Sequence, residues 1–214
     1  MSPCGQNRFP KRYIIGVAGP MAAGKNLVTD ILAKQGFSVI DADKLGHTVL
    51  EQSKEAILSQ FEDQAAKKNL NLINPDGSIH RKNLGSIVFA NKKNLARHEA
   101  VMHPKMNEYI ENQIRMNPDT SYVINAAILH KFTVITQCNI VLFVTAPFFL
   151  RLNRAFKRTK SSKLHILKYF FAQFKIFDKC KKLNADIYKV NNSGTQECLE
   201  TDIMSIVQTC IERG

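Results

Sequence analysis

A glycine-rich loop near the N-terminus constrains the fold of this 214-residue chain more than any other feature. The segment Gly19-Pro-Met-Ala-Ala-Gly-Lys-Asn26 has the G-x-x-x-x-G-K spacing of a phosphate-binding loop (P-loop). An apolar, β-branched run, Tyr13–Ala18, precedes it, and Leu27–Lys34 follows with apolar residues at helical spacing. This order predicts that loop N–H groups, the helix N-terminus and Lys25 bind a polyphosphate.

The alternation of strand and helix patterns predicts an α/β fold. Gly36 ends the first helix and Phe37–Ile40 resumes a strand, so the chain begins with a βαβ unit whose crossover is right-handed. Three later runs are short and rich in β-branched or aromatic residues: Tyr122–Ala126, Ile140–Thr145 and Ile187–Val190. We expect a five-stranded parallel sheet flanked by helices.

A long helical region separates the second and third predicted strands. Residues 45–118 have little strand signal and contain one turn, Asn74–Gly77. Helical patterns occur around Val49–Phe61, Lys82–Phe89 and Leu95–Ile114, and Gln196–Ile211 predicts a final helix. A helical insertion on the parallel sheet accounts for this organisation.

The composition indicates a globular protein with surplus positive charge. Thirty Lys and Arg against eighteen Asp and Glu give a net charge of +12, which favours anionic partners or provides a solvated surface. The longest mostly apolar stretch, Ile140–Leu150, is too short to span a membrane, and residues 1–12 do not have a secretory signal pattern. The five cysteines form no C-x-x-C pair. We expect a cytoplasmic protein with reduced thiols and no membrane partner.

The last position of the loop departs from the usual motif. A Ser or Thr normally stands there, and its hydroxyl ligates the Mg²⁺ that bridges the nucleotide phosphates. Asn26 offers a neutral amide oxygen instead, which is a hard ligand that can take this place. Pro20 has no N–H, so the loop has one donor fewer than usual. We expect a nucleotide and Mg²⁺ at this loop, with Asn26 as the candidate metal ligand. The candidate cofactor-binding residues of the loop are Gly19, Met21, Ala22, Ala23, Gly24, Lys25 and Asn26.

Further motifs follow the loop in a definite order. Asp41 and Asp43 stand at the carboxyl end of the second predicted strand, where open α/β sheets bind ligands. We expect the segment that carries these two aspartates to be extended. The later motifs are Asp76–Leu84, Ile87–Phe89, His103–Pro104, Val123–Leu129, Arg154 with Arg158, Ala185–Asp186 and Asn192–Gly194.

This series resembles the dephospho-coenzyme A kinase family, from about Tyr13 to Gly194. The P-loop is shared by many proteins, whereas the ordered combination of Ile40-Asp41-Ala42-Asp43, Ile87-Val88-Phe89 and His103-Pro104 is much more specific. The resemblance implies ATP-dependent phosphorylation of the ribose 3′-hydroxyl of dephospho-CoA, the last step of coenzyme A biosynthesis. It implies a P-loop kinase three-layer fold, with a nucleotide-binding core (13–44, 119–150, 184–212), a helical CoA-substrate domain (45–118), and a lid with its following helix (151–183).

The resemblance also implies roles for single residues. Asp43 would orient or deprotonate the attacking hydroxyl, and Asp41 would take a secondary part beside Lys25 or Mg²⁺. Arg154 and Arg158, on one side of a helix, would close over the transferring phosphates. The implied substrate-binding residues are Asp41, His47, Arg81, His103, Ile128 and Leu129, with Arg81 at the pyrophosphate of dephospho-CoA. Asn192 and Gly194 would lie beside the adenine.

Structural alternatives exist for several of these residues. Asp43 can cap a helix that starts at Lys44, and His103, before a proline, can be a capping residue. Arg154 and Arg158 can be exposed surface charges. The basic and aromatic stretch 151–182 can bind nucleic acid, although its aromatic spacing favours a helix packed on the core.

The sequence departs from the family at Ala127 and Lys131, where Pro and Glu are usual, and at Asn26. These departures leave two other functions open. One is a different nucleotide or small-molecule kinase of the same fold. The other is a nucleic-acid-binding relative with weak or no catalytic activity, although the ordered motifs favour small-molecule substrates over nucleic acid.

Overall fold

The computed structural model describes residues 12–158, 166–167, 170, 173, 176–181 and 185–213. The strands are β1 (Ile14–Ala18), β2 (Ser38–Asp41), β3 (Tyr122–Asn125), β4 (Ile140–Thr145) and β5 (Ile187–Asn191). The helices are α1 (Lys25–Lys34), α2 (Ala42–Gln52), α3 (Lys54–Ala66), α4 (Arg81–Val88), α5 (Lys92–Met116), α6 (Phe148–Arg158), α8 (Ile176–Lys181) and α9 (Gln196–Arg213), with 3₁₀ turns η1 (Leu129–Lys131) and η2 (Thr133–Gln137).

The chain divides into two compact units. One contains the described residues up to Asp41 and from Gln113 on, and the other is Ala42–Asn112. The first unit holds the sheet, and the second holds α2, α3, α4 and most of α5.

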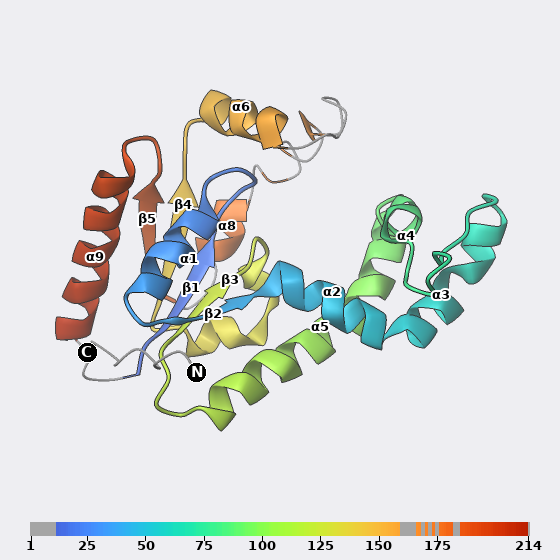
Figure 1. Ribbon diagram of the computed structural model, residues 1–214, viewed down its shortest axis with the longest axis horizontal. Helices are drawn as coiled ribbons and strands as arrows, with labels where there is room; N and C mark the ends of the chain where they lie inside the picture. Colours follow the sequence, from blue (N-terminus) through green and yellow to red (C-terminus); the bar gives the residue numbers. More distant parts are fainter. Residues whose placement is uncertain are drawn as a thin grey trace. The chain divides into compact units, whose positions relative to one another are not determined.

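The described strands form one sheet in the order β2-β3-β1-β4-β5, and every pairing is parallel, as predicted (Figure 1). The central strand, β1, is buried at all five positions, because it has neighbours on both edges and layers on both faces. Parallel pairing puts the carboxyl ends of all five strands at one edge. The segments that follow β1, β2, β3 and β5 therefore begin at the same edge of the sheet.

Helices α1 and α9 cover one face of the sheet, where they contact each other (Figure 1). Ile15 and Val17 of β1 belong to the same buried core as Ile31 of α1 and Ile203 of α9. The alternate residue of β1, Gly16, faces Leu129 and Cys138 on the opposite side, where η1, η2 and α8 lie. The predicted three-layer arrangement is confirmed.

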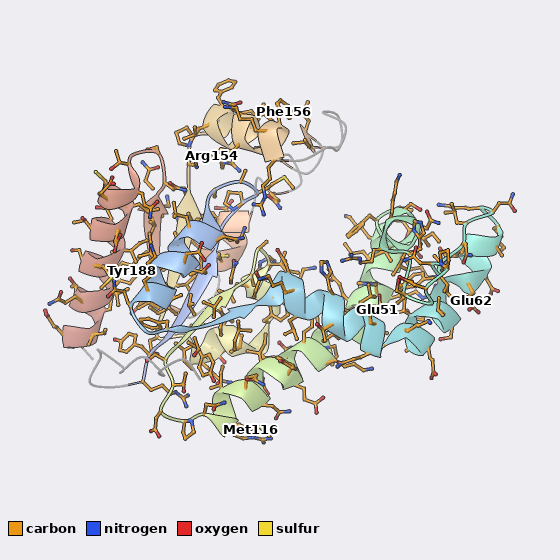
Figure 2. All side chains as sticks on the ribbon, in the orientation of Figure 1. Glu51, Glu62, Met116, Arg154, Phe156 and Tyr188 are labelled. Atoms are coloured by element: carbon orange, nitrogen blue, oxygen red, sulfur yellow. The ribbon has the colours of Figure 1, made fainter. Side chains whose placement is uncertain are left out.

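The helical unit contains one break that the sequence pattern did not predict. The pattern around Val49–Phe61 belongs to two helices, because α2 ends at Gln52 and α3 starts after its N-cap residue, Ser53. The predicted turn Asn74–Gly77 is confirmed by a 2.9 Å hydrogen bond from Gly77 N to Asn74 O. Both oxygens of the Glu51 carboxylate, labelled in Figure 2, lie 3.2 Å from the N–H of Ile79 and accept its hydrogen bond.

The longest described helix, α5, is largely polar and contains Pro104 in its interior. Within the described parts of the chain, no helix combines the length and the apolar character needed to cross a membrane.

Candidate functional site

The predicted P-loop connects β1 to α1 at the carboxyl edge of the sheet. Gly19 and Gly24 adopt φ angles of 149° and 102°, in the region that favours glycine. A Cβ atom at Gly24 would collide with Nδ2 of Asn192, and one at Gly19 would collide with the carbonyl oxygen of Val144. Conformation and space therefore both require glycine at the two ends of the loop.

The loop leaves the N-terminus of α1 without a side-chain cap. Gly24 is the N-cap residue and makes no side-chain hydrogen bond to the first turn, whose N–H groups have no intrahelical partners. The Nζ of Lys25 donates a 3.2 Å hydrogen bond to Gly19 O, which holds the ammonium group over the loop. A helix N-terminus beside a lysine makes a binding site for a phosphate anion.

Asn192, directly after β5, connects the P-loop to the end of β4. Its Nδ2 donates to Ala23 O at 2.9 Å, and its backbone N–H donates to Thr145 O at 2.7 Å. The side chain is buried, with 5% of its surface exposed. The structure thus brings this predicted cofactor-binding residue directly against the loop, while Gly194 is exposed two residues further on.

Helix α6 carries the two predicted arginines. Arg154, labelled in Figure 2, is half-buried. Its Nη1 donates a 3.2 Å hydrogen bond to Asn192 O. The alternative that Arg154 is an exposed surface charge is therefore wrong. Arg158 lies one turn further along α6 and is exposed. The predicted lid extends past α6 into residues 159–165 and other positions that lie outside the described residues.

A third arginine of α6, Arg151, contacts the P-loop itself, and the sequence analysis did not single it out. Its guanidinium donates to Ala146 O at 3.1 Å and to Met21 O at 3.4 Å, and lies 5.0 Å from the ring centroid of Phe170. Burial lowers the pKa of Arg151 below its ordinary value. Gln173 binds the same loop residue, because its Oε1 accepts a 2.6 Å hydrogen bond from Met21 N. The only sequence signal was that Arg151 begins a basic stretch.

Asn26 contacts a partner from the strand beside β1. Its Oδ1 accepts a 3.0 Å hydrogen bond from Nδ2 of Asn125, the last residue of β3. Asn125 is paired in register with Val17 of β1 and with Asp41 of β2. Sequence reasoning missed Asn125; the available signal was a single amide side chain at the carboxyl end of an otherwise apolar strand.

The two aspartates at the carboxyl end of β2 differ in their surroundings. Asp41 is the last residue of β2, whereas Asp43 lies in the first turn of α2 and is exposed. Helix α2 begins at Ala42, so the expectation of an extended segment is wrong. The alternative that Asp43 caps a helix starting at Lys44 is wrong for the same reason. His47 is exposed four residues after Asp43, on the same side of α2.

The helical unit positions the next two predicted substrate-binding residues. Arg81 is exposed at the first position of α4, directly after the N-cap residue His80. His103 is half-buried in the interior of α5, so the alternative that it caps a helix is wrong. The substrate contacts of Arg81 and His103 stay predictions.

Ile128 and Leu129 lie after β3, in the first unit. Ile128 precedes η1 and is half-buried, while the side chain of Leu129 is fully buried beside Gly16. Leu129 is therefore a core residue. Whether either residue also contacts substrate stays a prediction.

A P-loop at the carboxyl end of the central strand of a parallel, helix-covered sheet defines the class of P-loop nucleotide-binding proteins. Comparison with known proteins narrows this class. The family model for dephospho-CoA kinase matches residues 13–197, and the chain belongs to this family.

Individual relatives agree with this assignment. A dephospho-CoA kinase of Treponema denticola is 35% identical over 199 residues, which cover 91% of this chain and 89% of the relative. The crystal structure of a Thermus thermophilus protein shares the fold, with a TM-score of 0.75 and 24% identity over 93% of this chain and 98% of that one. A dephospho-CoA kinase from Campylobacter jejuni has a TM-score of 0.68 and 25% identity over 93% and 97% of the two chains.

Proposed function

We propose that this protein transfers the γ-phosphoryl group of ATP to the ribose 3′-hydroxyl of dephospho-CoA, giving CoA and ADP. This is the reaction of the kinase family to which the chain belongs, and it is the last step of coenzyme A biosynthesis. The observation that carries the proposal is the P-loop with Lys25, built at the carboxyl edge of β1 within a chain that matches the family almost throughout.

The P-loop supplies the grip on the phosphates of ATP. Its N–H groups and the N-terminus of α1 donate hydrogen bonds to the anionic phosphates of the nucleotide. Lys25 neutralises the outer phosphates as a point charge. Phosphoryl transfer depends mainly on positioning and charge stabilisation, so a rigid loop matters more than reactive side chains. The bonds from Asn192 and Arg151 to Ala23 and Met21 support such rigidity.

The acceptor side of the proposal rests on chain position and family resemblance. We assign to Asp43 the orientation or deprotonation of the 3′-hydroxyl, and to Arg81 the pyrophosphate of dephospho-CoA. His47, His103, Ile128 and Leu129 are the remaining acceptor-binding candidates, with Asp41 in a supporting position.

Arg154 and Arg158 would stabilise charge on the transferring phosphoryl group from α6, since a guanidinium matches phosphate oxygens in a fork geometry. Asn192 and Gly194 would border the adenine. We propose that ATP enters with Mg²⁺ bound to its phosphates and that the reaction takes place in the cytoplasm.

One assay tests the reaction. The purified protein is incubated with ATP, Mg²⁺ and dephospho-CoA, and CoA is identified by its mass. We expect CoA and ADP in equal amounts, and we expect Lys25→Ala to form neither, while Lys34→Ala, an exposed lysine at the other end of α1, retains activity. Phosphorylation of another nucleotide in an acceptor panel, without CoA formation, would favour a different kinase of the same fold.

A further inference from the structure

Two asparagine side chains meet where α1 begins. Asn26, the residue after the P-loop lysine, receives at Oδ1 the 3.0 Å hydrogen bond of Asn125 Nδ2. Asn125 ends β3, the strand that pairs with β1 on the side of β2, and only 5% of its surface is exposed. The amide pair therefore joins the first turn of α1 to the neighbouring strand, at the sheet edge that carries the P-loop.

P-loop enzymes ordinarily bind their metal ion through residues at these two positions, the residue after the P-loop lysine and the end of a neighbouring strand. The Ser or Thr that ends the loop ligates Mg²⁺ through its hydroxyl, together with an aspartate at the end of a nearby strand. A hydroxyl and a carboxylate bring one negative charge to the cation, whereas two amides bring none. Protein-bound Mg²⁺ is usually held by one or two carboxylates and by substrate phosphates.

The chemistry of the Asn26–Asn125 pair does not fit an ordinary protein-held Mg²⁺. The amide oxygen of Asn26 is engaged by the hydrogen bond, and Asn125 presents its NH₂ group to the loop. Turning Asn26 to ligate a cation would leave the buried NH₂ group of Asn125 without this acceptor, which is unfavourable.

We propose that Asn26 and Asn125 form a carboxylate-free lining of the phosphate site, so that the protein binds a nucleoside diphosphate or triphosphate almost independently of a divalent cation. The inference rests on the proposed function, because it requires nucleotide phosphates in the P-loop. A carboxylate at position 125 would repel the phosphates unless a cation neutralised them both. A neutral amide removes this repulsion, and with it most of the benefit that a cation brings to binding.

The alternative to this proposal is that the carboxylate of Asp41 holds a cation at the phosphate site. Asp41 ends β2, and it is in register with Asn125, so the two side chains lie on the same face of the sheet. If Asp41 held a cation together with the phosphates, nucleotide binding would depend strongly on metal, and Asp41→Asn would abolish that dependence. This result would overturn the proposal.

Calorimetric titration with ADP, in excess Mg²⁺ and in excess EDTA, tests the inference without using catalysis. For the wild type we expect the two dissociation constants to agree within about threefold. Asn125→Asp should weaken binding in EDTA, and Mg²⁺ should restore it, so that the ratio of the two constants rises to about tenfold or more. Asn125→Ala is the matched control, because it removes the hydrogen bond without adding charge, and its ratio should stay near that of the wild type.

Circular dichroism and thermal unfolding show whether Asn125→Asp is folded. If it is not, a second variant keeps the test decisive. Asn26→Asp places the carboxylate at an exposed position of the same pair and should raise the ratio in the same direction. A wild-type ratio of about tenfold or more, or an unchanged ratio in the folded aspartate variants, overturns the inference alone. If the wild type binds ADP neither in excess Mg²⁺ nor in excess EDTA, the proposed function is overturned as well.

Discussion

Arg154 on α6 and Asn192 after β5 are joined by a 3.2 Å hydrogen bond from the arginine Nη1 to the asparagine carbonyl oxygen. The Asn192 side chain in turn donates to Ala23 O of the P-loop. This chain of contacts connects the helix of the predicted lid to the loop that we expect to bind the phosphates. This bond uses one of the five N–H donors of the Arg154 guanidinium and fixes the position of the group.

The first prediction concerns the guanidinium of Arg154. Arg154→Lys keeps the charge but replaces a planar fork of donors by a single ammonium group, so we expect kcat for CoA formation to fall by about tenfold or more. Steady-state kinetics with ATP and dephospho-CoA measure this effect. Lys157→Ala, at an exposed position of the same helix, is the control and should leave kcat within about twofold of the wild type. Equal kinetics for Arg154→Lys and the wild type would remove Arg154 from the mechanism.

The second prediction concerns the close approach of Gly24 to Asn192. Gly24→Ala places a Cβ on a residue with a φ of 102° and pushes the Asn192 amide away from Ala23. We expect the free energy of unfolding to fall by about 2–4 kcal/mol, from backbone strain and loss of a buried hydrogen bond. Nucleotide binding should be lost with it.

Gly85→Ala is the control for Gly24→Ala. Its Cβ would lie 3.7 Å from the Phe89 ring, an ordinary contact, inside helix α4. Removing a helix-interior glycine should raise the free energy of unfolding by about 0.5–1 kcal/mol. Denaturant titration of both variants compares the two effects, and equal changes would contradict the structure around Gly24.

The third prediction concerns the proposed acceptor-side role of Asp43. Asp43→Asn removes a proton acceptor while keeping the size of the side chain, so kcat should fall by about 10²-fold or more and the KM for ATP should change little. Steady-state kinetics at saturating dephospho-CoA separate these parameters. The control is Asp63→Asn, an exposed aspartate in α3, which should behave as the wild type. A kcat for Asp43→Asn close to the wild-type value would show that Asp43 neither activates nor orients the hydroxyl.

The fourth prediction concerns the buried thiol of Cys138. Burial raises the pKa of Cys138 to about 12. The folded state therefore holds a proton that the unfolded state releases near pH 9, so the stabilisation from this group is complete below pH 9 and is lost as the pH rises toward 12. Above pH 9, the wild type should lose up to about 1.4 kcal/mol per pH unit more than Cys138→Ala. Denaturant titrations at several pH values measure this difference, and parallel pH profiles would contradict it.

Local patterns were sufficient to predict the sheet and the loop. The runs Tyr13–Ala18 and Ile140–Thr145 are continuous apolar segments because their strands are buried on both faces, and both appear in the sheet within one residue of the predicted bounds. The pattern around Val49–Phe61 was misleading because the core-facing residues of α2 and α3, such as Val49 and Ile57, keep a helical spacing across Ser53. Periodicity does not report where a helix ends when the next one starts at once.

The sequence by itself determined the P-loop, the parallel strands and the family, because strand, loop and helix patterns are local and their order along the chain is diagnostic. Tertiary structure decided which side chains reach the loop. Asn125 is 99 residues from Asn26, and Asn192 is 169 residues from Ala23. Both contacts arise because the order β2-β3-β1-β4-β5 brings the ends of distant strands to one edge, and a strand order is fixed by packing over the whole chain rather than by any local spacing.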